Sequence, residues 1–334
     1  MPWSLVGNSR AVQVLQRSLE SGGARHAYLF AGPEQTGRAT AAKLLAQALN
    51  CLGEDRPCGE CTQCRRIAEG IHSDVQTVSV GINEDGAVRR DISVEQMRDV
   101  ERAIALAPYE GQVRVVIIDP AEKMNDAAQN AFLKSLEEPP PHVVFILITA
   151  DASGLLETVR SRCATVPFTL VPTSEMEQAL RERGVEGEQA LLAGLAGGRP
   201  GWAFAAAGEK RFLESRRELL DQARALPGMD LADRFDLSYS LAEAFKKDRE
   251  KALASIDEWT RWWRDVLVVQ SGVEESVSNR DRLTQLQEDA PAFERDEVVN
   301  FVESLVETRL CLVANVQARI ALDALMLGVP KRKR

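Results

Sequence analysis

Apolar and polar positions follow different patterns in the two halves of the chain. Four short runs in the first half, rich in apolar or β-branched residues, favour buried strands, and they span residues 28–32, 75–80, 113–118 and 143–148. The segments between them carry helical spacing, as in residues 40–49. The last two runs show almost no polar position, which is typical of strands covered on both faces. The first half therefore predicts an α/β domain with a parallel sheet covered by helices.

The strand pattern ends near Phe168, where a strand-like or extended stretch over residues 161–172 leaves the sheet region. Helical blocks follow at residues 174–183 and 188–196, and the run Gly-Gly-Arg-Pro-Gly at residues 197–201 ends them. This arrangement predicts a small helical domain after the sheet domain.

From about Glu209 onward, amphipathic helical spacing dominates the sequence. Near the end of the chain that spacing is carried by Val302, Leu305, Val306, Leu310, Val313, Val316, Ile320 and Leu325. We therefore expect three domains and a basic tail, over residues 1–167, 168–208, 209–330 and 331–334.

Length and charge agree with this division and limit the function. At about 150 residues per domain, 334 residues fit two or three domains. The net charge is −9, from 41 basic and 50 acidic residues, which disfavours tight DNA binding by the chain alone. The basic tail, Lys331 to Arg334, is interpreted as a solvated end.

The sequence indicates a cytoplasmic protein. Its longest apolar run, residues 143–148, is far short of the ~20 residues that a membrane span requires. The first residues lack the basic region and apolar core of an export signal. In the cytoplasm, the six cysteines are expected to be metal ligands, catalysts or core residues rather than disulfides.

A candidate phosphate-binding loop, Gly32 to Ala39, lies between a predicted strand and a predicted helix. Such a loop needs glycines, here Gly32 and Gly37, together with a lysine and a hydroxyl that holds Mg²⁺. Arg38 occupies the lysine position and Ala39, which cannot bind a metal, occupies the hydroxyl position. Thr40 is one residue late, about 100° away on a helix. The loop therefore indicates a degenerate nucleotide site, and a simple Gly-Pro turn is the alternative.

A second motif supports the nucleotide-site interpretation. Asp119 ends the third predicted strand, where an acid supports Mg²⁺ through water. Pro120 follows it, at the position where an active ATPase would carry a glutamate. Glu122 is interpreted as an acid of a helical first turn.

Three segments together resemble one known family. Residues 26–33 (HAYLFAGP), 130–140 (NAFLKSLEEPP) and 161–163 (SRC) look like the clamp-loader branch of the AAA+ superfamily, and best like the bacterial DNA polymerase III delta-prime subunits. The resemblance implies an AAA+ domain, a small helical lid and an all-α collar. It also implies a stator in a ring that uses ATP to place the sliding clamp on primed DNA, with delta and gamma/tau subunits as partners and no membrane.

The same resemblance assigns roles to two residues. Arg162 would project into the ATP site of a neighbouring subunit, where a guanidinium stabilises the transferring phosphoryl group; a surface salt bridge is the alternative. Thr149 would sense the γ-phosphate, or it is simply a threonine at the end of a strand. Arg199 is offset from the family's lid arginine, so that role is not transferred.

Four cysteines, Cys51, Cys58, Cys61 and Cys64, lie within fourteen residues, in a module over about residues 50–66. Four thiolates complete a tetrahedral zinc site that is closed to water. An iron–sulfur cluster, a redox pair and unrelated free thiols are the alternatives. Bacterial clamp-loader subunits carry the same module, so the resemblance implies structural Zn²⁺.

Two further interpretations concern the helical part and the function as a whole. Trp259, Trp262 and Trp263 form a helical stripe that we expect in a core or subunit interface rather than as a platform for base stacking. For the chain, the first hypothesis is a clamp-loader stator whose own ATP binding is doubtful and that hydrolyses no ATP in isolation. The alternatives are an active ATPase subunit, of a clamp loader or a related DNA-repair protein, and a zinc-stabilised adaptor.

Overall fold

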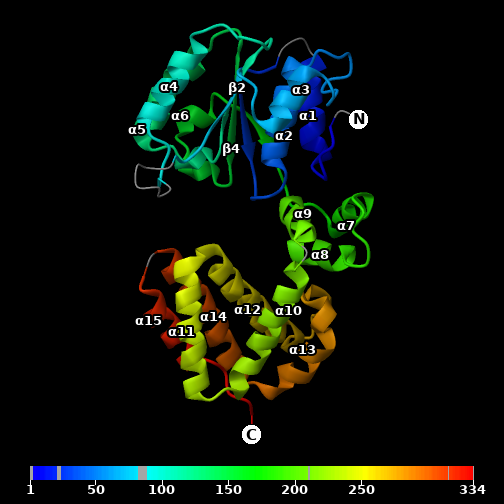
Figure 1. Ribbon diagram of the computed structural model, residues 1–334, viewed down its shortest axis with the longest axis vertical. Helices are drawn as coiled ribbons and strands as arrows, with labels where there is room; N and C mark the ends of the chain where they lie inside the picture. The colour runs from blue at the N-terminus through cyan, green and yellow to red at the C-terminus, as the bar shows by residue number, and fades with distance from the viewer. Residues whose placement is uncertain (1–2, 21–23, 82–88, 210, 315, 334) are drawn as a thin grey trace. The chain divides into compact units, whose positions relative to one another are not determined.

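The computed structural model describes residues 3–20, 24–81, 89–209, 211–314 and 316–333. The chain forms two compact units, residues 1–205 and 206–334. In Figure 1 the first unit runs from blue to green and the second from green to red. The first unit holds a sheet between helices and the second is built from helices. The predicted α/β class of the first half is therefore confirmed.

Five parallel strands form the sheet of the first unit. They are β1 (Ala27–Ala31), β2 (Val75–Val78), β3 (Arg114–Ile118), β4 (Val143–Thr149) and β5 (Ala164–Pro167). Their order is β2-β3-β4-β1-β5, and every pairing is parallel. β4 is buried along its whole length, because β1 and β3 flank it and helices cover both faces. The carboxyl ends of these three strands meet at one edge, where α/β sheets bind ligands.

Helices cover both faces of this sheet (Figure 1). On one side lie α1 (Ser9–Glu20), α2 (Arg38–Asn50) and α3 (Thr62–Glu69), and on the other α4 (Val94–Ile104), α5 (Asp126–Glu137) and α6 (Glu157–Arg160). Neighbouring residues of a strand point to opposite faces. Leu29 and Phe145 therefore pack in the core beneath α4 and α5, whereas Phe30 and Ile146 pack beneath α1 and α2.

Three short helices follow the sheet: α7 (Thr173–Glu182), α8 (Gln189–Ala196) and α9 (Pro200–Gly208). The expected break at residues 197–201 is present. Gly197 ends α8 in the left-handed conformation, with φ 54°, and Pro200 begins α9, where its missing N–H costs no hydrogen bond. The boundary between the two units falls within α9. A separate lid domain over residues 168–208 stays a prediction.

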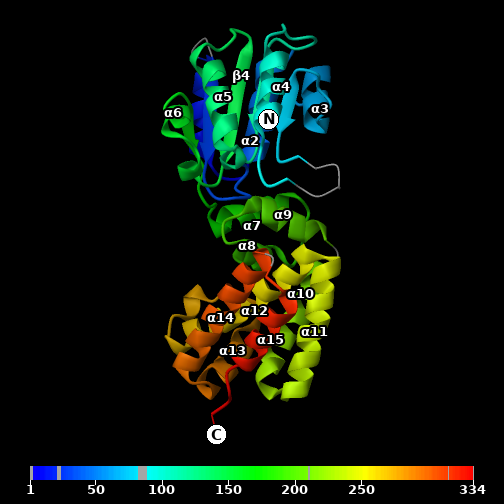
Figure 2. The ribbon, with the colours of Figure 1, turned by 90° about the vertical axis from the view of Figure 1, so that its left-hand side faces the viewer.

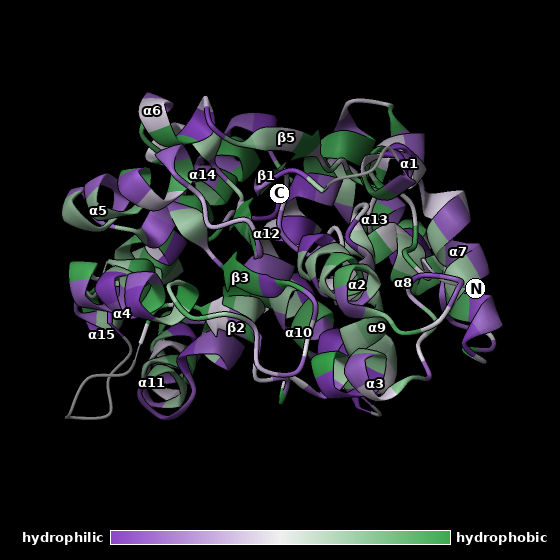
Figure 3. Ribbon diagram, turned by 90° about the horizontal axis from the view of Figure 1, so that it is seen from above, coloured by the Kyte–Doolittle hydropathy of each residue, from purple (hydrophilic) through white to green (hydrophobic). Residues whose placement is uncertain are grey.

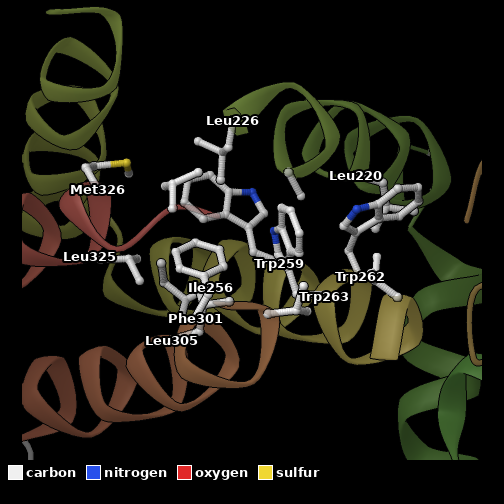
Figure 4. Close-up of a cluster of buried hydrophobic side chains, with 14 of the residues drawn as sticks. Leu220, Leu226, Ile256, Trp259, Trp262, Trp263, Phe301, Leu305, Leu325 and Met326 are labelled. Carbon is white, nitrogen blue, oxygen red and sulfur yellow. The ribbon is translucent and has the colours of Figure 1, made fainter. Parts of the chain in front are cut away.

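The second unit contains α10 (Phe212–Ala225), α11 (Leu231–Lys247), α12 (Arg249–Gln270), α13 (Leu283–Asp289), α14 (Arg295–Val313) and α15 (Ala318–Leu327), also seen in Figure 2. Figure 4 shows the core of this unit, in which Trp259, Trp262 and Trp263 of α12 are at most 1% exposed. Trp263 meets the rings of Phe293 and Phe301 edge-on, with centroids 5.2 and 5.4 Å away. The interpretation of the tryptophans as core residues is confirmed.

The apolar series near the end of the chain does not form one buried face. α14 ends at Val313 and α15 begins at Ala318, so the helical spacing is interrupted. Leu305 and Leu325 are buried, but most of the other positions in the series are exposed: Val306, Leu310, Val313, Val316 and Ile320. The regular spacing in the sequence therefore combines residues of the buried face with apolar residues that lie on the surface.

The described residues of the basic tail are exposed, as a solvated end would be, but they also make contacts with the second unit. Arg332 pairs with Asp289 at 3.1 Å, and Lys333 pairs with Glu294 at 3.4 Å. The backbone N–H of Lys333 also donates to the carbonyl of Ala292 at 2.8 Å. These acids lie about forty residues earlier, so the charge run alone could not reveal them. Arg334 lies outside the described residues.

Most helices carry both hydrophilic and hydrophobic residues (Figure 3). This mixture agrees with amphipathic helices that cover a core on one side. Within the ranges described by the structure, no helix is both long enough and apolar enough to cross a membrane.

Candidate functional site

A cleft of about 400 Å³ opens at the carboxyl edge of the sheet, between the candidate phosphate loop and the ends of β3 and β4. Its lining includes Gly37, Arg38 and Asp119, so the fold brings together residues that are about 80 positions apart in the sequence. Gly32 begins the loop with φ 151°, and a Cβ there would lie 2.1 Å from the carbonyl oxygen of Phe168. Only glycine therefore fits this close approach of two backbone segments.

Arg38 is the one cationic residue among the described residues that line the cleft. It is buried at the start of α2, and its Nη1 has no hydrogen-bond partner among the described residues. Burial lowers the pKa of its guanidinium, whereas the charges of Asp119, Glu122 and Glu34 oppose that shift. Burial likewise raises the pKa of Asp119, against the nearby charge of Arg38. Among the described lining residues, Arg38 thus faces the carboxylates of Glu34, Asp119 and Glu122.

The structure adds lining residues that the sequence interpretation missed. Glu122 lies in the first turn of a short 3-10 helix (Ala121–Lys123), as the sequence indicated, and it also lines the cleft: its Oε1 accepts the N–H of Ala150 at 3.1 Å. Thr40 also lines the cleft, although its offset by one residue predicted that it would point elsewhere. Glu34 lies within the loop itself, so its position in the sequence could have placed it at the cleft. The position of Glu122 in the sequence could not, because the turn after Asp119 determines where its side chain points.

Thr149 is fully buried at the end of β4. Its carbonyl accepts the N–H of Gly32 at 3.2 Å, and its hydroxyl accepts the N–H of Asp151 at 3.1 Å. Ile148 and Ala150, on either side of it, line the cleft. Thr149 thus fixes the start of the loop through the hydrogen bond to Gly32. Its role in sensing a γ-phosphate stays a prediction.

The four predicted cysteines come together after α2. Their sulfur atoms all lie within 4.8 Å of one another, and those of Cys58 and Cys64 are 4.0 Å apart. In a tetrahedral site with Zn–S bonds of about 2.3 Å, the sulfurs would be about 3.8 Å apart. The cluster could therefore hold a metal ion such as zinc with little movement.

Backbone N–H groups point at the sulfurs of this cluster. The N–H groups of Gly53 and Cys58 donate to the sulfur of Cys51, at 3.4 and 3.3 Å. The N–H of Cys64 donates to the sulfur of Cys61 at 3.5 Å, and this bond also caps the N-terminus of α3. Burial opposes ionisation of Cys61, but donors that include the N–H of Leu52 outweigh it and lower its pKa to about 6. Burial raises the pKa of Cys64 to about 12. A bound cation would stabilise all four as thiolates.

A buried polar network joins the cysteine module to the sheet. Gln47 of α2 donates to the carbonyl of Cys64 at 2.7 Å, and Gln63 of α3 meets the ring of His72 at 2.6 Å. His72 Nδ1 in turn accepts the N–H of Asp74 at 3.0 Å. Isolated polar residues of this kind carry no recognisable motif, so the sequence did not single them out.

Arg162 lies just beyond α6, and it is absent from the described residues that line the cleft. Its Nη2 donates to Glu137 at 2.7 Å and its Nη1 to the carbonyl of Thr158 at 2.9 Å. The side chain is 36% exposed. The salt bridge that was the alternative interpretation is thus present, and the role in a neighbouring ATP site stays a prediction.

Comparisons with known proteins agree with the motifs and the fold. A family model described as DNA polymerase III, delta subunit, matches residues 7–172. The chain is 29% identical to DNA polymerase III subunit delta' of Bacillus subtilis, over 95% of this chain and 94% of that protein. It is 36% identical to the tau subunit of the same organism, over 55% of this chain and 32% of tau, so it spans only about a third of that relative.

Among solved structures, a gamma subunit-related protein of DNA polymerase III from Thermotoga maritima aligns with a TM-score of 0.46 and 20% identity. That alignment covers 95% of this chain and 97% of the other. The sequence matches, together with the five-stranded parallel sheet, show that the chain belongs to the clamp-loader subunits of DNA polymerase III and is a homologue of delta-prime.

Proposed function

We propose that this chain is the stator of a bacterial replicative clamp loader. It assembles in the cytoplasm with subunits of the delta and gamma/tau types and helps them to place the sliding clamp on primed DNA. It donates Arg162 to ATP bound by an adjacent subunit and does not hydrolyse ATP itself. Its membership of the clamp-loader family supports these partners.

The observation that carries the proposal is the location of Arg162. The guanidinium is half-exposed beside α5 and α6, outside the cleft of its own chain. An arginine in this location can serve a site on another subunit. There, it would stabilise the charge that develops on the transferred phosphoryl group, and a donated arginine is worth about 10³- to 10⁵-fold in rate, or about 4 to 7 kcal/mol.

The cleft of this chain supports the other half of the proposal. Ala39 offers no hydroxyl to Mg²⁺ and Pro120 offers no base to a water molecule. Glu122 carries a carboxylate, but its hydrogen bond to Ala150 ties it to the end of β4. We therefore expect negligible ATP hydrolysis by the isolated chain. The glycine loop and Arg38 still offer donors for weak nucleotide binding.

We also propose that the four cysteines bind a structural zinc ion. Four thiolates fill the shell of a tetrahedral Zn²⁺ ion and leave no position for substrate or water. The metal would therefore hold the module together and take no part in catalysis.

The test uses a reconstituted clamp loader with wild-type, Arg162→Ala or Arg162→Lys subunit. After assembly is verified, DNA-stimulated ATPase and clamp loading are measured over a range of ATP concentrations. Arg162→Ala should lower both activities, and Arg162→Lys should be nearly as poor, because a lysine lacks the planar fork. The total ATPase rate of the ring should fall less than the rate at the one site that faces Arg162, because the other ATP sites keep their own arginines.

Two results would contradict the proposal. The first is wild-type activity of the assembled Arg162→Ala complex at every ATP concentration. The second is ATP turnover by the isolated chain that Asp119→Ala abolishes, which would indicate an active motor subunit instead.

A further inference from the structure

The carboxylate of Glu137, at the end of α5, holds the guanidinium of Arg162 from one side. The two groups are 2.7 Å apart, and the carbonyl of Thr158 holds Nη1 from α6 at 2.9 Å. We propose that Glu137 is a positioning residue that aims Arg162 at the ATP of the adjacent subunit. This inference rests on the proposed function of Arg162.

The backbone around Arg162 is already fixed by its neighbours. The hydroxyl of Ser161 donates to the carbonyl of Thr158 at 3.2 Å. Cys163 packs against the core between the sheet and α4 to α6, and burial raises its pKa to about 12. The remaining freedom therefore lies in the long side chain of Arg162, which holds many rotamers when nothing contacts it. The contact with Glu137 removes part of that freedom.

The arrangement leaves the arginine able to bind phosphate. A guanidinium carries five N–H donors, and its contacts with the described residues use two of them and leave three. The Glu137 contact involves a single nitrogen, and the two side chains are 36% and 52% exposed, so water screens the pair. A triphosphate can thus engage the free donors without first separating Arg162 from Glu137.

The opposite role for Glu137, a latch that keeps Arg162 away from ATP, predicts the opposite result. A latch would need to occupy the donors that the phosphate uses. Here three donors stay available among the described contacts, and the acceptor of Nη1 is a neutral backbone carbonyl, which competes with a phosphate less strongly than a carboxylate does. Removal of Glu137 therefore lowers activity if the residue positions Arg162, and raises it if the residue is a latch.

The experiment uses the reconstituted complex with the other ATP sites inactivated, so that only the site facing Arg162 turns over. We compare Glu137→Ala, Glu137→Gln, Arg162→Ala and the double variant Glu137→Ala/Arg162→Ala. Glu137→Ala should lower kcat about two- to five-fold, the range expected from an exposed ion pair, and leave KM unchanged, because the arginine acts on the transition state. Glu137→Gln should restore most of the rate, since its amide oxygen still accepts from Nη2.

Two controls separate positioning from a general structural effect. In the Arg162→Ala background, Glu137→Ala should cause no further loss. Glu138→Ala, which removes the adjacent exposed carboxylate, should match wild type.

The outcomes also separate this inference from the proposed function. If Arg162→Ala lowers kcat but Glu137→Ala equals or exceeds wild type, the positioning role is wrong and the arginine finger stands. An additional loss from Glu137→Ala in the Arg162→Ala background would overturn the positioning role in the same way. If Arg162→Ala itself has no effect, both proposals fail.

Discussion

Burial raises the pKa of an aspartate and hydrogen bonds from N–H groups lower it, and two aspartates of the first unit show the two outcomes. Asp119, in the cleft, is partly buried close to Arg38, and burial raises its pKa. Asp74, at the opposite edge of the sheet, is fully buried, but it accepts the N–H groups of Tyr109, Glu110 and Gly111. Burial alone would raise the pKa of Asp74, and these donors outweigh it, so its pKa is lowered. The two carboxylates therefore suit different roles, one structural and one at a ligand site.

His72, beside Asp74, leads to a prediction about pH. Burial lowers its pKa below the ordinary 6.5, although Glu110 and Asp74 oppose this shift and Arg66 adds to it. As pH falls below about 6.5, the unfolded chain binds a proton that the folded chain does not. The free energy of unfolding should therefore decrease, by at most about 1.4 kcal/mol per pH unit, until the folded pKa is reached.

The measurement is urea unfolding between pH 7.5 and 5.0. His72→Gln should flatten the dependence on pH, whereas His142→Gln should retain it. Both variants keep the four cysteines, so any release of metal by acid cancels in the comparison. Equal slopes for wild type and His72→Gln would contradict this account.

At the scale of single residues, the sequence predicted those parts of the site that belong to motifs. Gly37, Arg38 and Asp119 meet in the cleft because each follows a strand, and parallel strands end at one edge. Glu122 was missed because its placement depends on the turn after Asp119. The sequence also could not identify Glu137 as the partner of Arg162, because that contact depends on how α5 and α6 pack.

At the scale of elements, the cysteine module has little regular secondary structure. The loop over residues 51–61 contains no helix or strand, and α3 is only eight residues long. Helices this short are marginal without tertiary support. Ile67 joins α3 to the apolar core beneath the sheet, and polar contacts of Gln47 and Gln63 add to this connection. A metal ion would therefore supply much of its stability.

We predict one zinc ion per chain, bound by Cys51, Cys58, Cys61 and Cys64. Its removal by a chelator should raise hydrogen exchange across residues 51–69 while β4 stays protected, because metal binding and local folding are coupled. Metal analysis of purified protein should find zinc in wild type and in Cys311→Ala, and none in Cys58→Ala/Cys61→Ala. Iron with sulfide, or metal retained by the double variant, would refute the assignment.

The elements themselves were largely predictable, with exceptions that have physical causes. The apolar runs predicted four strands, whereas β5 (Ala164–Pro167) was predicted only as part of a strand-like or extended stretch, because it is short and half of it is exposed. The order β2-β3-β4-β1-β5 leaves no mark on local sequence. The interruption between α14 and α15 was missed because apolar residues continue through it at helical spacing.

At the scale of the whole molecule, the second unit combines an apolar core with apolar residues on its surface. The exposed residues of α14 do not belong to the core around Trp259 and Trp263. Val306, Leu310 and Val313 are 46%, 60% and 47% exposed, and their spacing of four and three places them on one face of α14. Apolar surface of this kind marks a contact site, and for a clamp-loader subunit the expected occupant is another subunit of the ring.

We therefore predict that Leu310→Glu weakens assembly with the other clamp-loader subunits by about ten-fold or more. The change removes an apolar side chain worth roughly 1.5 to 3 kcal/mol on burial and places a charge in the interface. Folding should be unaffected, because Leu310 is exposed, and tryptophan fluorescence of the core around Trp259 reports this directly. Leu106→Glu, at a site in the first unit that is 65% exposed, is the matched control and should assemble normally. The affinity is measured by titrating labelled chain with the remaining subunits, and wild-type affinity for Leu310→Glu would place the assembly surface elsewhere.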